Sequence, residues 1–391
     1  MAPVRTYLDH NATSPIRPEV LAAVTDALSC LGNPSSVHAE GRAARELVER
    51  ARAQVAALVG ARPDDVTFTS GGTEANATVL RPGSLKDEGG RAAASLLVCA
   101  TEHASVLSGH GFSADRAGEL AVGPDGRIDL GALSRALAEQ GQGSTIVSVQ
   151  GANSETGVVQ PLSEVARIVQ ASGGILHSDV VQLAGRSPVD MPSLGLDAAT
   201  LSGHKLGAPA GIGALVIRAG RAGPDLPLIR GGGQEGRLRA GTQNLAGIVG
   251  FGIAAEIAAR ELAQEAPRLA GLRDRAEREV LRLAPEAVVF GAGAARLPNT
   301  LAFAVPGLSA ETALMSLDLD GVAVSSGSAC SSGKVAPSHV LAAMGVPGDL
   351  ARGAIRVSFG WNSREEDVIR FSQAFETLLR RLYDRGRAYA A

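Results

Sequence analysis

The sequence predicts an α/β protein with a large domain, built on a mostly parallel sheet covered by helices, and a smaller C-terminal α+β domain. Short β-branched runs alternate with stretches long enough for a helix, a pattern typical of strands buried on both faces. Residues 254–283 are rich in Ala, Arg, Glu and Leu with a helical period, which predicts a long connecting helix. Beyond it the pattern changes, and strands are followed by a last helix at 365–383.

The first long element predicted in the large domain is an amphipathic helix from Ala39, which Gly60 and Pro63 end. Apolar strands are then predicted at 66–69, 96–99, 145–149, 174–177, 198–201 and 214–217. The strands of the smaller domain are predicted at 300–305, 322–324 and 354–359. We place the large domain at residues 15–258, and the small domain at residues 1–14 together with 259–391.

The composition is that of a globular protein without an excess of basic residues. The 391 residues carry 37 basic and 40 acidic side chains, a formal charge of −3, so nucleic acid is not an expected partner. The longest apolar run, Leu245–Ala255, is well short of the ~20 residues needed to cross a bilayer. The N-terminal residues lack the apolar stretch of a signal peptide, so we expect a cytoplasmic protein without membrane contact.

Cysteine and lysine are scarce, which shortens the search for reactive groups. The three cysteines are far apart, without Cys-x-x-Cys spacing: Cys30, Cys99 and Cys330. A disulfide scaffold and a cysteine-rich zinc site are therefore excluded, and no His-Glu-x-x-His motif predicts a metal site. The chain has only three lysines for amine chemistry: Lys86, Lys205 and Lys334.

Lys205 follows a buried strand in the motif Thr200–Ala214, where glycine and proline enforce a tight turn. Partial desolvation at that place would lower the pKa of the amine, as a Schiff-base lysine requires. The alternative is a solvated lysine on a loop.

A strand, a glycine pair and a helix start follow one another in Val66–Thr78, so the backbone N–H groups of Gly72 and Thr73 would point outward. Such a helix N-terminus binds phosphate, although the same residues can also simply be a helix cap. A second glycine motif, Gly231–Gly236, matches G-x-G-x-x-G but leads into Arg-Leu-Arg rather than an apolar helix. We therefore reject a dinucleotide site.

The apolar run from Gly174 ends in Asp179 and Gln182. An acid at the carboxyl end of a parallel strand lies where α/β proteins bind ligands. A carboxylate there could keep a pyridine nitrogen protonated, which is how proteins tune pyridoxal phosphate as an electron sink. A strand-end cap is the alternative.

Cys330 lies among serines and glycines in Val324–Pro337. Free cysteines are usually buried hydrophobes, but such small-residue surroundings do not suit a core position and favour a nucleophile. Cys30 and Cys99 follow apolar patterns, and we expect both to be structural.

Together these residues resemble the cysteine desulfurases of the NifS/IscS-like type, a branch of the class V, fold-type I pyridoxal-phosphate-dependent enzymes. Besides the lysine and cysteine motifs, the matches run in order along most of the chain: Tyr7–Thr13, Gly32–Ser36, Ser70–Asn76, Glu102–Ala104, Asn153–Val158, Arg239–Asn244 and Ile355–Gly360. The resemblance implies a fold-type I transferase fold, with a large domain that binds the cofactor and a small domain that carries the cysteine loop.

The resemblance implies pyridoxal 5′-phosphate as the cofactor and gives each matching residue a role. Lys205 would hold it as an aldimine and remove the Cα proton of the substrate, and His103 would stack on its ring. Asp179 would pair with the ring nitrogen, and Gln182 would bond the phenolic oxygen together with Asn153. The phosphate would be bound by Gly72, Thr73, Ser202, His204 and, in a homodimer, Thr242 of the partner subunit.

The resemblance also implies the reaction. Arg356 would clamp the carboxylate of L-cysteine, because its planar fork suits a bidentate pair, with Asn33 and Asn153 assisting. Cys330 would attack the substrate sulfur and become a persulfide, so that L-alanine is released. The sulfur would then pass to an acceptor protein such as an iron–sulfur scaffold, or to tRNA or cofactor thiolation.

Two other functions remain open. One is a selenocysteine lyase or another class V lyase or aminotransferase, which would not need the thiol of Cys330. The other is a non-catalytic sulfur-carrier scaffold, which would not need the lysine, the strand-end acid and the arginine together. The chain departs from the family at Val180-Val181, where Ala-Thr is common, and over residues 110–122, which puts local structure in question more than function.

Overall fold

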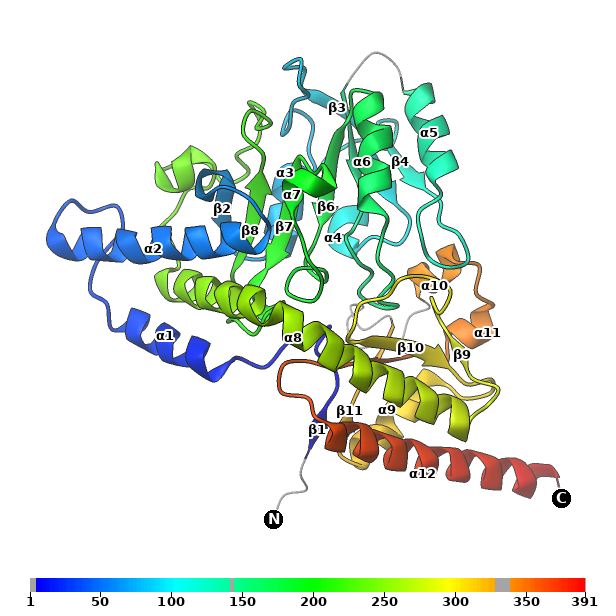
Figure 1. The fold of residues 1–391 in the computed structure, drawn as a ribbon. Helices are drawn as coiled ribbons and strands as arrows, with labels where there is room; N and C mark the ends of the chain where they lie inside the picture. Colours follow the sequence, from blue (N-terminus) through cyan, green and yellow to red (C-terminus); the bar gives the residue numbers. More distant parts are fainter. Residues whose placement is uncertain (1–4, 141–143, 328–337, 391) are drawn as a thin grey trace.

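A seven-stranded sheet forms the centre of the large domain in the computed structural model, which describes residues 5–140, 144–327 and 338–390. The strand order is β2-β8-β7-β6-β5-β3-β4 (Figure 1). Among these strands only β8 runs against its neighbours, so the predicted mostly parallel sheet is confirmed. The strands are β2 (Val66–Thr69), β3 (Ala93–Cys99), β4 (Ala117–Leu120), β5 (Ser144–Ser148), β6 (Ile175–Asp179), β7 (Ala198–Ser202) and β8 (Gly213–Ile217).

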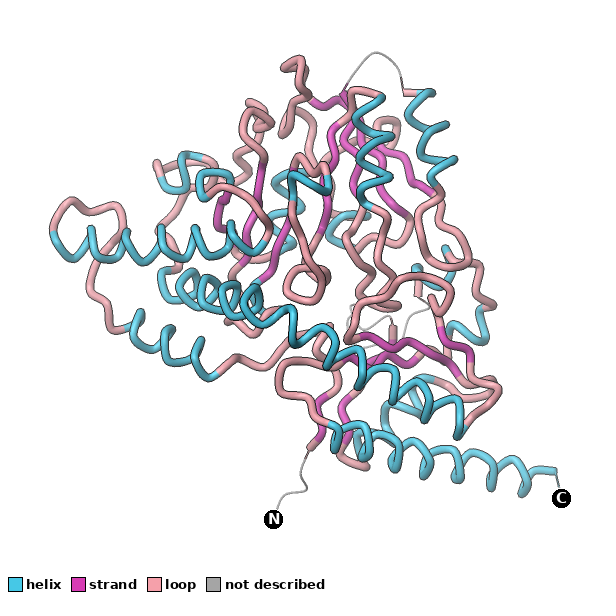
Figure 2. Tube along the Cα trace, viewed as in Figure 1, coloured by secondary structure: helices cyan, strands magenta, loops and turns pink. Residues whose placement is uncertain are grey.

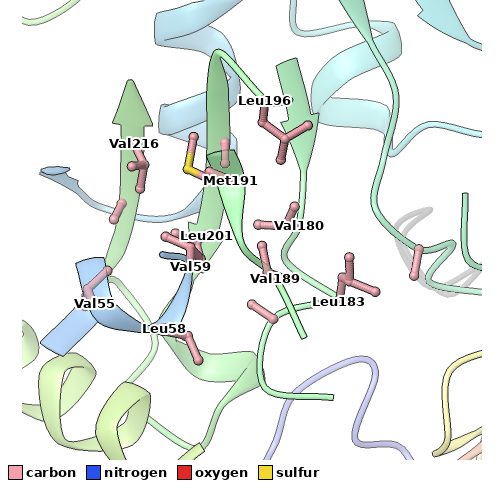
Figure 3. Close-up of a cluster of buried hydrophobic side chains, with 14 of the residues drawn as sticks. Val55, Leu58, Val59, Val180, Leu183, Val189, Met191, Leu196, Leu201 and Val216 are labelled. Atoms are coloured by element: carbon pink, nitrogen blue, oxygen red, sulfur yellow. The ribbon is translucent and has the colours of Figure 1, made fainter. Parts of the chain in front are cut away.

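Helices cover both faces of this sheet because its strands are apolar on both sides. In β5, for example, Val147 packs into one buried cluster and Ile146 into another across the sheet. The first cluster joins β7 to α2 and to the segment after β6, and Val55, Val180 and Leu201 are among its side chains (Figure 3). The helices of the large domain are α1 (Pro18–Leu28), α2 (Ala39–Leu58), α3 (Gly72–Val79), α4 (Ala104–Leu107), α5 (Leu130–Glu139), α6 (Leu162–Ala171) and α7 (Met191–Leu194), with short 3₁₀ helices η1 (Pro63–Asp65), η2 (Gly203–Lys205) and η3 (Gln234–Arg237).

The smaller domain has a four-stranded antiparallel sheet of order β12-β13-β10-β9, and a separate parallel pair of β1 and β11. Its core contains stacked and edge-on aromatic rings, with Phe303 of β10 packed against Phe371 and Phe375 of the last helix. Its strands are β1 (Thr6–Tyr7), β9 (Val288–Val289), β10 (Thr300–Ala304), β11 (Val322–Ala323), β12 (Ser325–Ser326) and β13 (Ile355–Ser358), and its helices are α9 (Ala310–Leu319), α10 (His339–Ala343), α11 (Gly348–Ala351) and α12 (Glu365–Ala390).

Helix α8 (Leu245–Leu283) passes from one domain to the other (Figure 2). It begins nine residues before the predicted start at 254, with the Asn244 side chain accepting from the Gly247 N–H as its N-cap. Its first half packs into the core of the large domain and its second half, from Leu269, into the core of the small one. The start was missed because the first turns are apolar on all sides and show no period. In the part of the chain that the structure describes, no helix has the length and apolarity to span a bilayer.

The two departures from the family pattern have a clear place in the fold. The segment 110–122 contains the edge strand β4, parallel to β3, with only Leu120 of its four residues buried. Val180 is fully buried in the core beneath the sheet, whereas Val181 lines the cavity described below. The first departure therefore lies at the edge of the sheet, and the second lies between the core and the cavity.

Candidate active site

A cavity of about 340 Å³ lies at the carboxyl ends of β5, β6 and β7, where the small domain meets the large one. Parallel strands end at the same edge of a sheet, which is where α/β proteins bind ligands. The cavity is lined mainly by polar side chains and by the N-terminal segment after β1: Asn11, Ala12, Gly72, Thr73, His103, Ser105, Gln150, Ala152, Ser154, Asp179, Val181, Gln182, Ser202, His204, Lys205 and Arg356.

Lys205 projects into this cavity from the 3₁₀ turn that follows β7. Its Nζ donates to the backbone carbonyl of Asn11 and, at 2.7 Å, to that of Ala12. The side chain is only partly exposed, so the structure favours the desolvated lysine over the solvated loop lysine.

Asp179 ends β6 beside the lysine and is held by two donors. Its Oδ2 accepts from Asn76 Nδ2 at 2.8 Å and its Oδ1 from the Val181 N–H at 3.0 Å. Behind it, the fully buried Glu102 has its pKa raised well above the usual range, because burial and the Asp179 charge both oppose ionisation. Burial therefore disfavours the charged form of Glu102, and Asp179 is the acid that faces the cavity.

The His103 ring is fixed by the first turn of α4. Its Nδ1 accepts from the Ser105 N–H at 3.1 Å and lies 2.8 Å from Ser105 Oγ, which in turn accepts from Asn76 Nδ2. Since Nδ1 acts as an acceptor toward a backbone N–H, the proton of the neutral ring is on Nε2. Asn76 thus connects the histidine to Asp179. Sequence reasoning missed Asn76 and Ser105, although the family motifs at 70–76 and 102–104 contain or adjoin them.

The N-terminus of α3 faces the cavity and no side chain caps it. The N-cap position is Gly71, and Gly72 and Thr73 form the first turn. This favours the phosphate interpretation over the cap interpretation, because backbone N–H groups there are left for a ligand. His204 lines the same cavity and has its pKa lowered to about 4 by burial and by the charges of Lys205 and Arg186, so it is neutral at pH 7.

Arg356 enters the cavity from β13 of the small domain and is 4% exposed. Its Nη2 lies 2.7 Å from Asp9 Oδ1, and its Nη1 donates to the Ser154 carbonyl at 3.0 Å. Glu155, next in the chain, is buried and accepts from the Ser338 hydroxyl. Burial raises the pKa of Glu155 to about 7, although Ser338 and Arg356 oppose the rise.

Not every predicted site residue lies in the cavity. Asn153 is buried but does not line it, because its side chain is used elsewhere: Oδ1 accepts from the Glu155 and Thr156 N–H groups of its own loop, and Nδ2 donates to the Thr101 carbonyl after β3. Asn33 and Thr242 are exposed and lie outside the cavity. Cys330 lies outside the described residues.

Two other predictions can be located. Cys99 is fully buried, as expected of a structural cysteine, whereas Cys30 is partly exposed. The rejected glycine motif at 231–236 contains Glu235, which is buried against α2 and β2 by Arg52 and the Phe68 N–H. Among the described residues, no cluster of His, Cys, Asp and Glu could hold a metal ion.

Comparison with known proteins shows the family of the chain. The model of the class-V aminotransferases matches residues 6–371, and the chain belongs to that family. Within it, the chain is 38% identical over 382 residues to a protein of Dictyoglomus turgidum named cysteine desulfurase IscS, covering 96% of this chain and 95% of the other. It is 41% identical over 372 residues to a cysteine desulfurase of Cereibacter sphaeroides, covering 93% and 92%.

Solved structures agree with these sequence matches. A NifS-like protein from Rickettsia africae superimposes with a TM-score of 0.86 at 34% identity, covering 96% of this chain and 99% of the other. The NifS/IscS-like resemblance and the fold-type I architecture expected from the motifs are therefore confirmed.

Proposed function

We propose that this protein is a pyridoxal-phosphate-dependent cysteine desulfurase that converts L-cysteine to L-alanine and transfers the sulfur to Cys330. The observation that carries the proposal is the convergence of Lys205, Asp179 and Arg356 on one cavity. An amine, an acid and a guanidinium are the groups needed to hold the cofactor, keep its ring protonated and bind an amino-acid carboxylate. The relatives named cysteine desulfurase support this choice.

The residues of the cavity fit pyridoxal 5′-phosphate from one end to the other. The uncapped α3 N-terminus with neutral His204 suits a phosphate, and Asp179 suits a pyridine nitrogen. When bound, the cofactor supplies an electron sink for the pair left by the substrate Cα–H bond. In this proposal Lys205 holds the cofactor and moves the Cα proton, His103 covers the ring, and Gln182 donates to the phenolic oxygen. The phosphate contacts are Gly72, Thr73, Ser202 and His204.

Arg356 binds the substrate carboxylate in this proposal, whereas Asn33, which is exposed and lies outside the cavity, is no longer assigned to the substrate. Asp9 and the Ser154 carbonyl hold the guanidinium in place before substrate arrives. The observed bonds of Asn153 give it a supporting role, because they shape the turn that aims the Ser154 carbonyl at Arg356.

The sulfur transfer needs a thiolate that Cys330 supplies. Its sulfur attacks the substrate sulfur, an S–S bond forms, the substrate Cβ–S bond breaks, and the electron pair of that bond is protonated to give L-alanine. The enzyme thiol becomes a persulfide, so no outside oxidant is required. An acceptor protein, such as an iron–sulfur scaffold, or a thiolation pathway then takes the sulfur.

A cytoplasmic homodimer is the assembly we propose. Exposed apolar side chains gather around the α1–α2 connection, where Leu28, Leu31 and Val37 are 73%, 82% and 84% exposed. Such a patch is typical of an interface between subunits. The exposed Thr242 would then reach the phosphate of the neighbouring site, as Thr242 of the partner subunit. We also propose the division into a large domain, 15–258, and a small domain, 1–14 with 259–391, since the two buried cores change over between Ala258 and Leu269.

The test is release of alanine and sulfide from L-cysteine with a thiol reductant. Wild type should release both in equal amounts, and Cys330→Ser should bind the cofactor but release neither. Cys30→Ser is the matched control and should behave as wild type, because Cys30 does not line the cavity. Full activity of Cys330→Ser would refute the persulfide step and favour a direct lyase. Greater turnover of selenocysteine than cysteine in that case would identify a selenocysteine lyase.

A further inference from the structure

Arg186 is an arginine buried beside the cavity without a carboxylate partner. It is 7% exposed and lies in the turn that follows β6. Among the described residues, no Asp or Glu lies within salt-bridge distance of it. Lysine and arginine are almost never fully buried unless they are paired, so this charge calls for a role.

The guanidinium makes its hydrogen bonds to neutral oxygens close to Lys205. Its Nη1 donates to the Gln182 side-chain Oε1 at 2.6 Å and to the Gln182 backbone carbonyl at 2.9 Å, and its Nη2 donates to the His10 carbonyl at 3.3 Å. Burial and the nearby Arg356 lower the pKa of Arg186 to about 10, which leaves it charged at pH 7.

These bonds decide which way the Gln182 amide faces. A guanidinium has donors only, so the amide atom next to Arg186 must be the oxygen. The amide nitrogen then faces the Asn11 carbonyl, to which it donates at 3.0 Å, and Gln182 lines the cavity. The amide thus has a second N–H to offer to a ligand oxygen. The same Asn11 carbonyl accepts from Lys205 Nζ, so Arg186, Gln182 and Lys205 form one continuous network.

The other arginines around Lys205, unlike Arg186, each pair with a carboxylate. Arg17 pairs with Glu261 at 2.8 Å and Arg356 pairs with Asp9 at 2.7 Å. Lys205 also lines a second, smaller cavity of about 50 Å³, which Arg17, Arg186 and Glu261 line as well. The remaining titratable groups that line either cavity are Asp179, His10, His103, His204 and Glu265. His10 and His204 are neutral, with pKa values lowered to about 3 and about 4 by burial and neighbouring cations. The positive potential behind the lysine therefore comes mainly from Arg186.

We propose that Arg186 is a positioning residue of the cofactor site, which turns an N–H of Gln182 toward the cavity and places an uncompensated positive charge behind Lys205. This inference rests on the proposed function. A donor at the phenolic oxygen favours its anionic form, and a nearby cation disfavours a proton on the lysine nitrogen. Both effects lower the pKa of the nitrogen that joins Lys205 to the cofactor.

The test is a pH titration of the visible absorption band of the cofactor-loaded protein without substrate. In Arg186→Met the pH midpoint of the band should rise by about 1 unit, because the variant loses both the nearby charge and the bond that orients the Gln182 amide, and a nearby charge alone shifts a pKa by that order. Arg186→Lys keeps the charge but replaces the two donating nitrogens of the guanidinium by one, so its midpoint should lie between those of wild type and Arg186→Met. Both variants should bind the cofactor.

Arg221→Met is the matched control. Arg221 is also a buried arginine, 5% exposed, but it pairs with Asp197 and Glu88 at 2.9 Å and does not line the cavity. Arg221→Met should unfold more easily than wild type, while the pH midpoint of its absorption band should equal that of wild type. A change in the Arg221 variant as large as that in the Arg186 variant would assign the shift to general loosening and overturn the inference.

The outcomes separate this inference from the proposed function. If the wild type forms no visible band with pyridoxal phosphate, both fail. If the band forms and the Arg186→Met midpoint equals that of wild type or is lower, only the role of Arg186 is refuted. Should Arg186→Met not fold, Arg186→Lys decides alone, and an unchanged midpoint in it overturns the inference.

Discussion

Replacing Glu235 by alanine is expected to destabilise the large domain by about 3–5 kcal/mol, the range seen when one partner of a buried ion pair is removed. Glu235 is 8% exposed and joins a loop to α2 and β2. Its carboxylate accepts from Arg52 Nη1 at 2.7 Å and Nη2 at 3.0 Å, from the Phe68 N–H at 2.9 Å and from Gln243 Nε2 at 2.9 Å.

The magnitude follows from what the substitution leaves behind. The Phe68 N–H of the edge strand β2 would lose its partner, and an unsatisfied buried donor costs about 1–3 kcal/mol. Arg52, 7% exposed, would keep only the Val66 carbonyl and the solvent-facing Glu49 as acceptors. The remaining part of the ~3–5 kcal/mol comes from leaving the buried Arg52 guanidinium without its buried counter-charge.

The measurement is urea-induced unfolding followed by far-UV circular dichroism, with Glu49→Ala as the control. Glu49 is the other carboxylate on Arg52, but its side chain is 55% exposed, so its loss should cost no more than about 1 kcal/mol. Equal losses in the two variants would refute the argument. Burial alone would raise the pKa of Glu235, but Arg52 outweighs it and lowers the pKa, so the contribution is fully present above pH 4.5 and disappears as pH falls further.

Three further outcomes are expected. Burial raises the pKa of Glu155 from 4.5 to about 7, so ionisation of this group opposes folding. As pH rises between those values, the free energy of unfolding should fall by up to about 1.4 kcal/mol per pH unit. Glu155→Gln should remove this pH dependence in unfolding curves. Burial raises the pKa of Cys99 to about 12, so mass spectrometry of the native protein treated with iodoacetamide near pH 8 should find Cys99 unmodified, and its rapid labelling would contradict the described core. Gly360→Ala would place a methyl group on the His10 ring and should cost about 1–3 kcal/mol in the same unfolding assay, whereas no loss would mean that the ring can move aside.

The strands of the large sheet were predictable because most are buried on both faces and therefore appear as short apolar runs. The predicted runs 66–69, 198–201 and 214–217 agree with β2, β7 and β8 to within a residue at each end. The edge strand β4 was not predictable in this way. It has one neighbour and one buried side chain, so its sequence, Ala-Gly-Glu-Leu, has no distinctive pattern.

The groups at strand ends could also be predicted, because a chain that leaves a parallel strand must enter the ligand-binding edge. Lys205, Asp179 and Gln182 were found by that reasoning, and all three line the cavity. Arg186 could not be predicted from its position after a strand. In sequence it is a single cation in a turn, and only the tertiary structure shows that it is buried without a carboxylate.

The N-terminal segment shows why local patterns cannot define such a site completely. Asp9 pairs with Arg356 across 347 positions of the chain, and Asn11 bonds Ser154 of the large domain and Thr300 of the small one. The Asn11 carbonyl also receives Lys205 Nζ and Gln182 Nε2. One short segment therefore fixes Lys205 and Arg356 relative to each other. A movement between the domains would have to change both sets of bonds together, so the distance between the two groups is set by the contact of the domains and not by either domain alone.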